Sequence, residues 1–413
     1  MFATIHRGAH EIGGSCIELE ADGSRIVMDL GRPLSAGWDD EVPLPDVDGL
    51  AEPDDSLRGV VLSHPHLDHY GLTRQLHPDV PVYLGEEAAS VLEAASFFSP
   101  ISTCPPLAGH LRHREPLHLG PFTVTPFLAD HSAFDAYSLL VEADGRRLFY
   151  TGDIRGHGRK AKLFDALVDH PPTVDVLLME GTNVRPAAES IPRLDESDVE
   201  DEIVATINAT EGLVATFSSA QNLDRLVTVY RAARRTGRTL VVDLYTASVA
   251  SATGRPSIPQ TGFEGLAIYV PQRQRVRVAR TEEFDRVKEI APFRVFPEDL
   301  VSGRDHLVYY GVSSAADELI RSGALADGAV VWSLWGGYLR ETSGKRLVKM
   351  LDAADVPITH HHTSGHAHVD DLVRLVDAFD PARVVPIHSE ATDRFASYFP
   401  RVEQHCDGER WEV

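Results

Sequence analysis

Cysteine, positive charge and long apolar runs are all scarce in this chain of 413 residues, and each scarcity excludes a class of protein. Its three cysteines, Cys16, Cys104 and Cys406, are scattered and odd in number. That excludes a disulfide framework and suits free thiols, buried by default, in a reducing cytoplasm. No apolar run is long enough to span a membrane, and the N-terminus lacks the pattern of a signal peptide. We therefore expect a cytoplasmic protein without a membrane partner.

Acidic residues outnumber basic residues in this chain. The chain has 39 Lys and Arg against 62 Asp and Glu, a formal net charge of −23 at pH 7. This charge argues against general, electrostatically driven binding of nucleic acid. An enzyme acting on nucleic acid would have to concentrate positive charge locally and add metal ions. Apolar residues are plentiful at 43%, which permits a substantial core and predicts two domains.

Among the residues present, the most informative segment is a histidine cluster that directly follows an apolar run. Residues Gly59 to Leu62 predict a buried strand, and Ser63 to His69 then read S-H-P-H-L-D-H. Imidazole and carboxylate groups together suit zinc, manganese or iron rather than calcium. The first two histidines could serve one ion, and Asp68 with His69 a second about 3.5–4 Å away. The competing interpretation, a polar surface loop that is rich in histidine, accounts less well for this spacing.

Three more polar residues stand at the ends of strand-like runs. His131 follows Phe122 to Leu128, Asp153 follows a run that begins at Leu148, and Asp29 closes the run from Arg25. Before Asp153, a glycine permits the tight turn that exposes its carboxylate. Any one of these residues alone would more often be a cap or turn residue. Together they indicate that one sheet edge gathers them with the histidine cluster.

In order and in strand-end context, these residues resemble motifs one to four of the metallo-β-lactamase superfamily. The resemblance implies two divalent metal ions, with zinc as the natural match and manganese as an alternative. One ion would be held by His64, His66, His131 and Asp153. The second would be held by Asp68, His69, the same Asp153 as a bridge, and His388. In that family the counterpart of Asp29 orients the ligand loop without touching an ion.

Three later motifs narrow the resemblance to the β-CASP nucleases. Leu177 to Asn183, containing Glu180, looks like motif A; His362 to Ala367, containing His366, looks like motif B; Val385 to Glu390, containing His388, looks like motif C. Over nearly its whole length the chain is similar to ribonuclease J-like members. A histidine at motif C is typical of RNA-directed members, which favours RNA over DNA.

The resemblance also implies the domain organisation. It predicts an α/β protein with a four-layer αββα metallo-β-lactamase fold and an inserted parallel α/β β-CASP domain. We expect the first part of the metallo-β-lactamase domain at residues 1–195, the insert at 196–344 and the return segment at 345–413. The residues of the insert independently indicate alternating strands and helices: strands at 213–217 and 239–243, and helices at 198–208 and 222–234.

The implied function is a metal-dependent ribonuclease that hydrolyses RNA phosphodiesters, as an endonuclease, a 5′-exonuclease or both. Asp68, Glu180 and His366 would act in catalysis. His366 would be the general acid or transition-state donor, and Glu180 would orient it and favour its charged form. Three alternatives stay open: a hydrolase of a small ester, lactone or phosphodiester on the same core, a DNA-directed β-CASP nuclease, and a non-catalytic RNA-binding or scaffolding protein.

Several residues are predicted to contact RNA or its phosphates. Arg273, Arg275 and Arg277 alternate, so in a strand they would share one face. Ser218 and Ser219 precede a predicted helix, where they could bind phosphate or simply cap it. Beside motif B the candidates are His362, Ser364 and Gly365. We expect single-stranded RNA as the substrate, and a homodimer or a subunit of a larger complex remains open.

Overall fold

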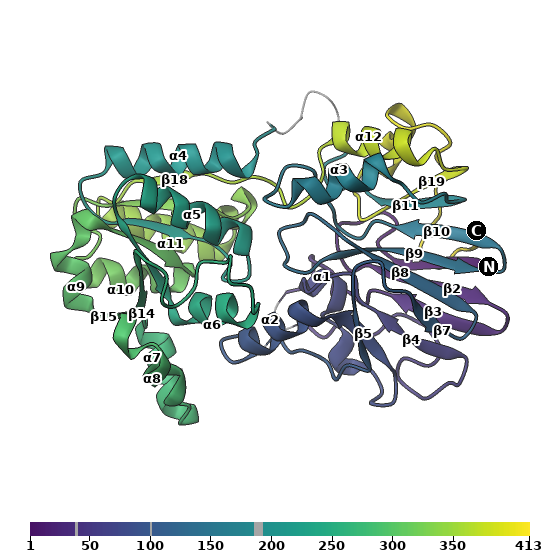
Figure 1. Cartoon of the computed structure of the whole chain (residues 1–413), viewed down its shortest axis with the longest axis horizontal. Helices are drawn as coiled ribbons and strands as arrows, with labels where there is room; N and C mark the ends of the chain where they lie inside the picture. The colour runs from purple at the N-terminus through teal and green to yellow at the C-terminus, as the bar shows by residue number, and fades with distance from the viewer. Residues whose placement is uncertain (38–39, 100, 186–192) are drawn as a thin grey trace. The chain divides into compact units, whose positions relative to one another are not determined.

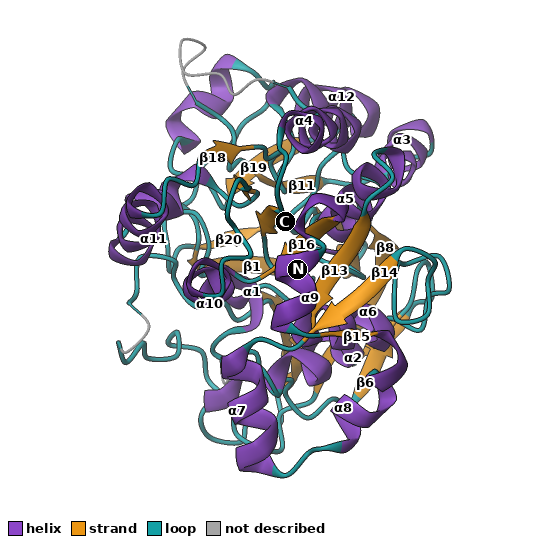
Figure 2. Cartoon of the chain, turned by 90° about the vertical axis from the view of Figure 1, so that its left-hand side faces the viewer, coloured by secondary structure: helices purple, strands orange, loops and turns teal. Residues whose placement is uncertain are grey.

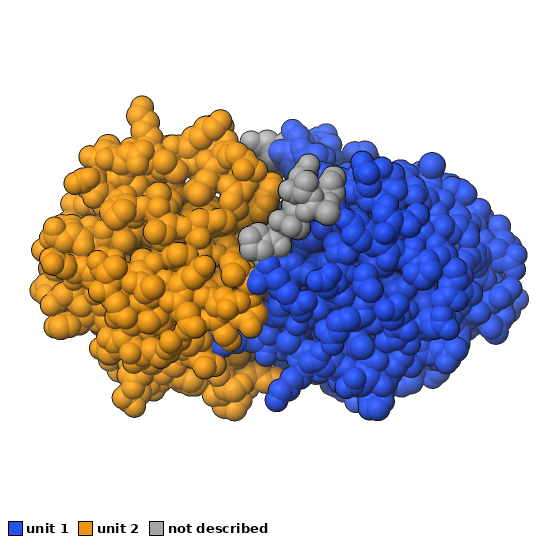
Figure 3. Space-filling model, turned by 90° about the horizontal axis from the view of Figure 1, so that it is seen from above, with its two compact units in different colours: residues 1–96, 100–193, 365–413 blue, residues 97–99, 194–364 orange. Residues whose placement is uncertain are grey.

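The computed structural model describes residues 1–37, 40–99, 101–185 and 193–413, and its chain divides into two compact units (Figure 3). Unit 1 comprises Met1–Ser96, Pro100–Arg193 and Gly365–Val413, and unit 2 comprises Phe97–Ser99 and Leu194–Ser364. The chain returns to unit 1 at Gly365, whereas the sequence places the return near residue 345. The extra residues stay in unit 2 because β18 (Ile358–His360) pairs with β17 (Ala329–Trp332).

Two mixed sheets form the frame of unit 1. The first has the order β20-β1-β2-β3-β4-β5-β6, with strands β1 (Phe2–Arg7), β2 (Cys16–Ala21), β3 (Ser24–Met28), β4 (Leu57–Val61), β5 (Val82–Gly85), β6 (Gly109–Leu111) and β20 (Arg410–Glu412). The second has the order β19-β11-β10-β9-β8-β7, with β7 (Leu117–Leu119), β8 (Phe122–Leu128), β9 (Tyr137–Ala143), β10 (Arg146–Tyr150), β11 (Val176–Glu180) and β19 (Arg383–Ile387).

The facing sides of these two sheets share one apolar core. Ile5 and Met28 of the first sheet belong to the same buried cluster as Leu139 and Leu178 of the second. Such packing removes the inward-facing side chains of both sheets from water, which is the dominant favourable term in folding. The outer sides are covered by helices, so unit 1 has the expected αββα layers.

The helices of unit 1 are short and amphipathic. The first sheet is covered by α2 (Glu86–Ser96), and α1 (Leu67–Tyr70) follows β4. The second sheet is covered by α3 (Ala161–Asp169) and α12 (Val369–Phe379), which lie side by side in Figure 1. The buried apolar residues of α12 recur at the spacing of one helix face, at Leu372, Leu375, Val376 and Phe379.

Unit 2 is built on a sheet whose strands are all parallel. Its order is β15-β14-β13-β16-β12-β17-β18, with β12 (Val214–Phe217), β13 (Thr239–Asp243), β14 (Leu266–Tyr269), β15 (Arg294–Val295) and β16 (Leu307–Gly311) besides β17 and β18. Figure 2 shows β13 and β14 lying next to each other. The central strands are buried on both faces, as in a sheet covered on both sides. The alternation of strands and helices that the sequence predicts is confirmed.

The helices of unit 2 connect these strands. They are α4 (Glu196–Ala209), α5 (Leu223–Arg235), α6 (Leu244–Ala252), α7 (Gln272–Thr281), α8 (Asp285–Glu289), α9 (Pro297–Ser302), α10 (Ala316–Arg321) and α11 (Thr342–Ala353). The side chain of Asn222 caps α5 by accepting a hydrogen bond from the backbone N–H of Arg225 (3.0 Å). The capping role left open for Ser218 and Ser219 therefore belongs to Asn222.

The predicted strand that carries Arg273, Arg275 and Arg277 is wrong, because these residues lie in helix α7. Its buried residues, Gln274 and Val278, are four apart, which is the spacing of one helix face. Arg273 and Arg277 are also four apart and share a face, but Arg275 points away from them, so the three arginines do not form one strip.

Two further expectations concern thiols and membranes. All three cysteines are free, but Cys16 alone is buried, since Cys104 is half-buried and Cys406 is exposed. Within the described part of the chain, no helix is long and apolar enough to cross a membrane.

Candidate metal centre

The loop after β4 brings its histidines together because Asp29 holds it. Asp29 follows β3, is fully buried, and adopts a left-handed backbone with φ +58°. Its carboxylate accepts hydrogen bonds from the backbone N–H (2.7 Å) and the hydroxyl (2.8 Å) of Ser63, and from the hydroxyl of Tyr150 (2.7 Å). The same carboxylate lies 2.7 Å from His69 Nδ1. Asp29 therefore orients both ends of the segment from Ser63 to His69.

A glycine allows this loop to approach the preceding turn closely. At Gly31, an added Cβ atom would lie 1.7 Å from the backbone oxygen of Asp68. No side chain fits at that distance, so the position of the histidine loop depends on glycine there.

Four predicted ligands form a first cluster. Donor atoms of His64, His66, His131 and Asp153 all lie within 4.8 Å of one another. His64 Nε2 is 3.5 Å from Asp153 Oδ2, and His131 Nε2 is 3.1 Å from His66 Nδ1. Ligands about 2.1 Å from a tetrahedral zinc ion lie about 3.4 Å from one another, so these separations fit a shared ion.

A second cluster adjoins the first and shares Asp153 with it. Its other members are Asp68, His69 and His388, again with donor atoms within 4.8 Å of one another. His69 Nε2 lies 3.3 Å from Asp153 Oδ2, and His388 Nε2 lies 3.3 Å from Asp68 Oδ2. His388 has φ +53°, a strained conformation for a residue with a Cβ atom, and such strain is concentrated at functional sites.

Buried polar atoms without partners test whether this site fits metal ions. Among the described residues, His64 Nε2, His69 Nε2 and both carboxylate oxygens of Asp153 are buried and make no hydrogen bond. Leaving one such group unsatisfied costs about 1–3 kcal/mol, and more for a charged group. Cations bound between these atoms would satisfy all four, so the donor set fits divalent metal ions.

Hydrogen bonds at Nδ1, the ring nitrogen that faces away from the cluster, fix the tautomers of three histidines. Ser63 donates its single hydroxyl proton to Asp29, so its oxygen accepts from His64 Nδ1 (2.9 Å). The carboxylate of Asp29 accepts from His69 Nδ1, and the carbonyl of Gly365 accepts from His131 Nδ1 (2.6 Å). In the neutral form of each ring, the Nε2 lone pair then faces the cluster. This is the arrangement that surrounding residues impose on metal-binding histidines.

Electrostatics keep several of the ligands in binding form. Burial would lower the pKa of His69, but Asp153 and Asp29 raise it well above the ordinary value, so this ring must lose a proton to bind an ion. Burial lowers the pKa of His64 and of His131 well below the ordinary value, which favours neutral imidazole. Burial alone would raise the pKa of Asp153, but His388 and His69 hold it well below its usual range. Burial likewise opposes ionisation of Asp68, yet a hydrogen bond from His388 lowers its pKa to about 2. Both carboxylates are therefore anionic at neutral pH.

Glu180 and His366 lie at the edge of the second cluster. Glu180 ends β11 and is fully buried, and its two oxygens accept hydrogen bonds from the backbone N–H groups of Thr182 (2.9 Å) and Ala367 (3.1 Å). His366 Nδ1 is 3.6 Å from Glu180 Oε1 and 3.6 Å from Asp153 Oδ2. Burial would lower the pKa of His366, but the charges of Asp153 and Glu180 raise it to about 9. An imidazolium that can give up a proton therefore stands beside the metal ligands.

The predicted RNA contacts are dispersed through the chain. Gly365 belongs to unit 1, where its carbonyl contacts His131, whereas Ser364 and His362 belong to unit 2. Ser218 is buried and donates to the carbonyl of Ser333 (3.3 Å), and Ser219 is exposed at the end of β12.

The arginines of α7 differ in their surroundings. Arg275 pairs with Glu318 (2.8 Å), and the guanidinium of Arg277 lies 5.1 Å from the centre of the Phe97 ring. Arg273 is exposed and makes no ion pair with any residue that the structure describes. It is therefore the most accessible cation of the three.

Two residues of the site have no role in the sequence prediction. Tyr150 donates to Asp29, and the hydroxyl of Thr182 lies between His366 and His388. Thr182 stands within the motif that contains Glu180, but nothing in the sequence places its hydroxyl beside residues about 200 positions away.

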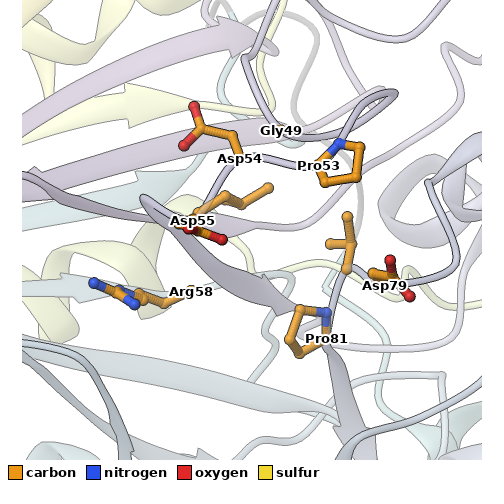
Figure 4. A pocket seen from close by; sticks show the side chains of 9 residues that line it. Gly49, Pro53, Asp54, Asp55, Arg58, Asp79 and Pro81 are labelled. Atoms are coloured by element: carbon orange, nitrogen blue, oxygen red, sulfur yellow. The ribbon is translucent and has the colours of Figure 1, made fainter.

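A surface pocket in unit 1 is separate from the metal centre (Figure 4). It is lined by Arg58 at the start of β4, by Pro81 just before β5, and by three aspartates of which Asp54 pairs with Arg25. The histidine loop follows the opposite end of β4. The pocket therefore lies at the wrong end of these strands to serve the metal cluster.

Two models of known protein families match this chain. Residues 36–222 match the family model for a "Beta-lactamase superfamily domain", and residues 358–407 match that for a "Zn-dependent metallo-hydrolase RNA specificity domain". The first range includes the histidine loop, His131, Asp153 and Glu180, and the second includes His366 and His388.

Individual relatives agree with these matches. Ribonuclease J of Mycobacterium tuberculosis is 26% identical over 427 residues, which cover 92% of this chain and 67% of that protein. An RNase J-like protein of Methanocaldococcus jannaschii is 26% identical over 261 residues, covering 59% of this chain and 57% of that one. A crystal structure of a protein of unknown function from Enterococcus faecalis has a TM-score of 0.80 at 20% identity, and the match covers 100% of this chain and 99% of that one. That structural likeness shows the fold alone.

Proposed function

Because this chain belongs to the ribonuclease J-like β-CASP family of the metallo-β-lactamase superfamily, we propose that it hydrolyses RNA phosphodiesters at the metal centre of unit 1. It is a metal-dependent hydrolase of the ribonuclease class. The observation that carries the proposal is the pair of ligand clusters that share Asp153, with His366 and Glu180 beside them. The proposal extends to the number of ions, the residues that hold them and the part each residue plays.

Two divalent ions would occupy the two clusters. The first would be held by His64, His66, His131 and Asp153, and the second by Asp68, His69, Asp153 and His388. Nitrogen and carboxylate donors at these spacings favour zinc, and manganese is the alternative. When bound, such ions lower the pKa of a water molecule and neutralise the charge of a phosphate.

The protein's own residues would orient the ligand rings and supply a proton. Asp29 fixes the ring of His69, and the carbonyl of Gly365 fixes that of His131. His366, charged at neutral pH because Asp153 and Glu180 raise its pKa, would donate a proton to the leaving oxygen of the sugar. Glu180 itself is held by two backbone N–H groups, which fix the position of its carboxylate beside His366.

Unit 2 would serve as the inserted β-CASP domain that contacts the RNA strand. Helix α7 offers an exposed arginine at Arg273 and another at Arg280. Exposed aromatic residues lie along the same part of the chain, at Phe284 (50% exposed) and Phe296 (49%), and the guanidinium of Arg294 lies 4.8 Å from the Phe296 ring. Arginines and exposed rings together suit single-stranded RNA, whose bases stack on aromatic side chains.

The test is cleavage of matched 5′-labelled single-stranded RNA and DNA by zinc- or manganese-loaded protein, resolved on a sequencing gel. We expect RNA to be cut and DNA to be left intact. Release of mononucleotides would identify 5′-exonuclease action, and internal fragments would identify endonuclease action. If fully metallated protein cuts neither polymer, the ribonuclease proposal fails and hydrolysis of small esters or phosphodiesters takes its place.

A further inference from the structure

Two histidines with separate tasks in the proposed reaction share one hydroxyl group. Thr182 Oγ1 lies 2.8 Å from His388 Nδ1 and 3.1 Å from His366 Nδ1. The two rings stack, with their centroids 5.4 Å apart and an interplanar angle of 27°. The backbone N–H of Thr182 donates to Glu180 Oε2 (2.9 Å), which fixes the threonine where β11 ends. A single side chain therefore contacts the proposed proton donor and a proposed metal ligand.

The chemistry of the hydroxyl sets the direction of one of these bonds. A hydroxyl has one proton to donate and two lone pairs that accept. His388 Nε2 lies 3.3 Å from Asp68 Oδ2 and 3.8 Å from Asp153 Oδ1, so Nε2 is the nitrogen that faces the second cluster. A nitrogen that ligates a metal carries no proton. The proton of a neutral His388 ring must then reside on Nδ1, which donates it to Thr182 Oγ1.

We propose that Thr182 is a positioning residue that holds His388 in its metal-binding tautomer and orients the ring of His366 through the same hydroxyl. The inference rests on the function proposed above. It completes a pattern, because His64, His69 and His131 already have oxygen partners for Nδ1 in Ser63, Asp29 and the Gly365 carbonyl. The hydroxyl of Thr182 contacts Nδ1 of two histidines at once.

If this hydroxyl is lost, a hydrogen bond between His388 and Asp68 would compete with binding of the second ion. Without an acceptor at Nδ1, the proton of His388 settles on Nε2, which already lies within hydrogen-bond distance of Asp68 Oδ2 (3.3 Å) when no ion is bound. That hydrogen bond occupies two ligands of the second ion at once. The first ion, whose ligands do not contact Thr182, would be unaffected.

The experiment compares three variants of this chain. Thr182→Val removes the hydroxyl and keeps the shape, and Thr182→Ser keeps the hydroxyl. The matched control is Thr392→Val, since Thr392 is buried and its hydroxyl lies 2.8 Å from His10 Nδ1 outside the metal clusters. Zinc dissociation constants for both sites are measured by competition with a chromophoric chelator, and kcat and KM are measured on RNA with saturating zinc. Thermal unfolding shows that each variant is folded.

We expect Thr182→Val to weaken binding of the second zinc ion roughly 10- to 100-fold and to leave the first unchanged. At saturating zinc its kcat falls while KM for RNA is retained, because His366 is no longer oriented. Thr182→Ser and Thr392→Val behave as the wild type. Unchanged affinity for the second ion in Thr182→Val overturns the inference, and so does a Thr182→Ser variant as impaired as Thr182→Val.

These outcomes separate the inference from the proposed function. A wild-type protein that binds two zinc ions but cuts no RNA overturns the ribonuclease proposal, while the comparison of zinc affinities still decides the role of Thr182 at the metal site.

Discussion

Asp153 is the side chain on which the two halves of the metal centre depend. Its carboxylate is buried among five imidazoles and belongs to both ligand clusters. Asp68, by contrast, belongs to the second cluster alone. The two aspartates therefore offer different experiments, because substitution of Asp153 would disturb both ion sites whereas substitution of Asp68 isolates one.

Asp68→Asn should lower the zinc content from two ions per chain towards one. The amide lacks the negative charge of the carboxylate, and its oxygen is a weaker ligand for zinc. Elemental analysis after removal of loosely bound metal measures the stoichiometry. Asp79→Asn, at an aspartate whose side chain is 82% exposed, is the matched control and should keep both ions. Two tightly bound ions in Asp68→Asn would contradict the two-cluster assignment.

His366→Ala should reduce RNA cleavage by roughly 10²- to 10⁴-fold, the usual contribution of general acid–base catalysis, and leave the zinc content unchanged. His366 contacts Asp153 and Glu180, but neither proposed ion needs it as a ligand. Single-turnover cleavage rates and elemental analysis on the same preparation measure both quantities. His118→Ala removes an exposed histidine of β7 and should have no effect. Full activity in His366→Ala would remove the residue from the mechanism.

For individual residues, local sequence patterns predict the candidate ligands, but they do not predict contacts between residues that are far apart in the sequence. Histidines and aspartates stand directly after strand-like runs, so His64, His131 and Asp153 can be identified as candidate ligands from local patterns. Tyr150 bonds to Asp29 across 121 positions, and Thr182 reaches His388 across 206. A hydroxyl carries no signal of its own in the sequence, because its partner is defined only once the strands are paired.

The boundaries of an element can be predicted from the sequence where the spacing of its residue types matches the spacing of its buried residues. The predicted ranges 122–128 and 239–243 coincide with β8 and β13. The Arg-rich segment failed because arginines at every second position mimic the period of a strand. Arginine has high helix propensity, and the residues that decide the period are the buried ones, Gln274 and Val278.

A cross-strand ion cluster on the first sheet gives a pH-dependent prediction. Glu18 on β2 accepts hydrogen bonds from His6 on β1 (2.8 Å) and from Arg25 on β3 (2.7 Å). Burial alone would raise the pKa of Glu18, but these two hydrogen bonds hold it below the ordinary value of 4.5. A carboxyl whose pKa is lower in the folded state contributes stability above its unfolded pKa, and this contribution is lost as pH falls through the folded pKa.

Glu18→Gln should therefore destabilise the metal-free protein by about 1 kcal/mol at pH 7, with a difference that shrinks as the pH falls below about 4. Urea unfolding at several pH values, followed by tryptophan fluorescence, measures it. Glu20→Gln is the control on the same strand, since Glu20 pairs with Arg410 at the exposed edge. An equal loss of stability at every pH would mean that the effect comes from packing and not from charge.

The complete chain assembles its site from distant segments. All the proposed ligands except His388 come from residues 64–153, whereas His366 and His388 follow the whole of unit 2 in the sequence. The sequence predicts this interruption from the motifs, but it does not predict where the insert ends. The pairing of β18 with β17 keeps residues up to Ser364 in unit 2, and a three-residue strand paired over such a distance has no distinct local pattern.

The net charge of −23 makes the few accessible cations decisive for RNA binding. Arg273 and Arg280 on α7 are exposed and make no ion pair within the described residues, while most arginines of α5 pair with acidic side chains. We expect the double variant Arg273→Glu, Arg280→Glu to bind single-stranded RNA more weakly. Each lost phosphate contact should also flatten the plot of log affinity against log salt by about 0.7.

Fluorescence anisotropy with labelled RNA measures this effect, in a His366→Ala background so that the RNA is not cut. Arg321→Glu, at an exposed arginine of α10 that pairs with Asp317, is the matched control in the same unit. It carries half the charge change of the double variant, and it should lower the affinity slightly without changing the salt slope. If the double variant and the control have equal slopes, α7 does not contact the RNA backbone, and the positive charge that RNA requires must come from the metal ions themselves.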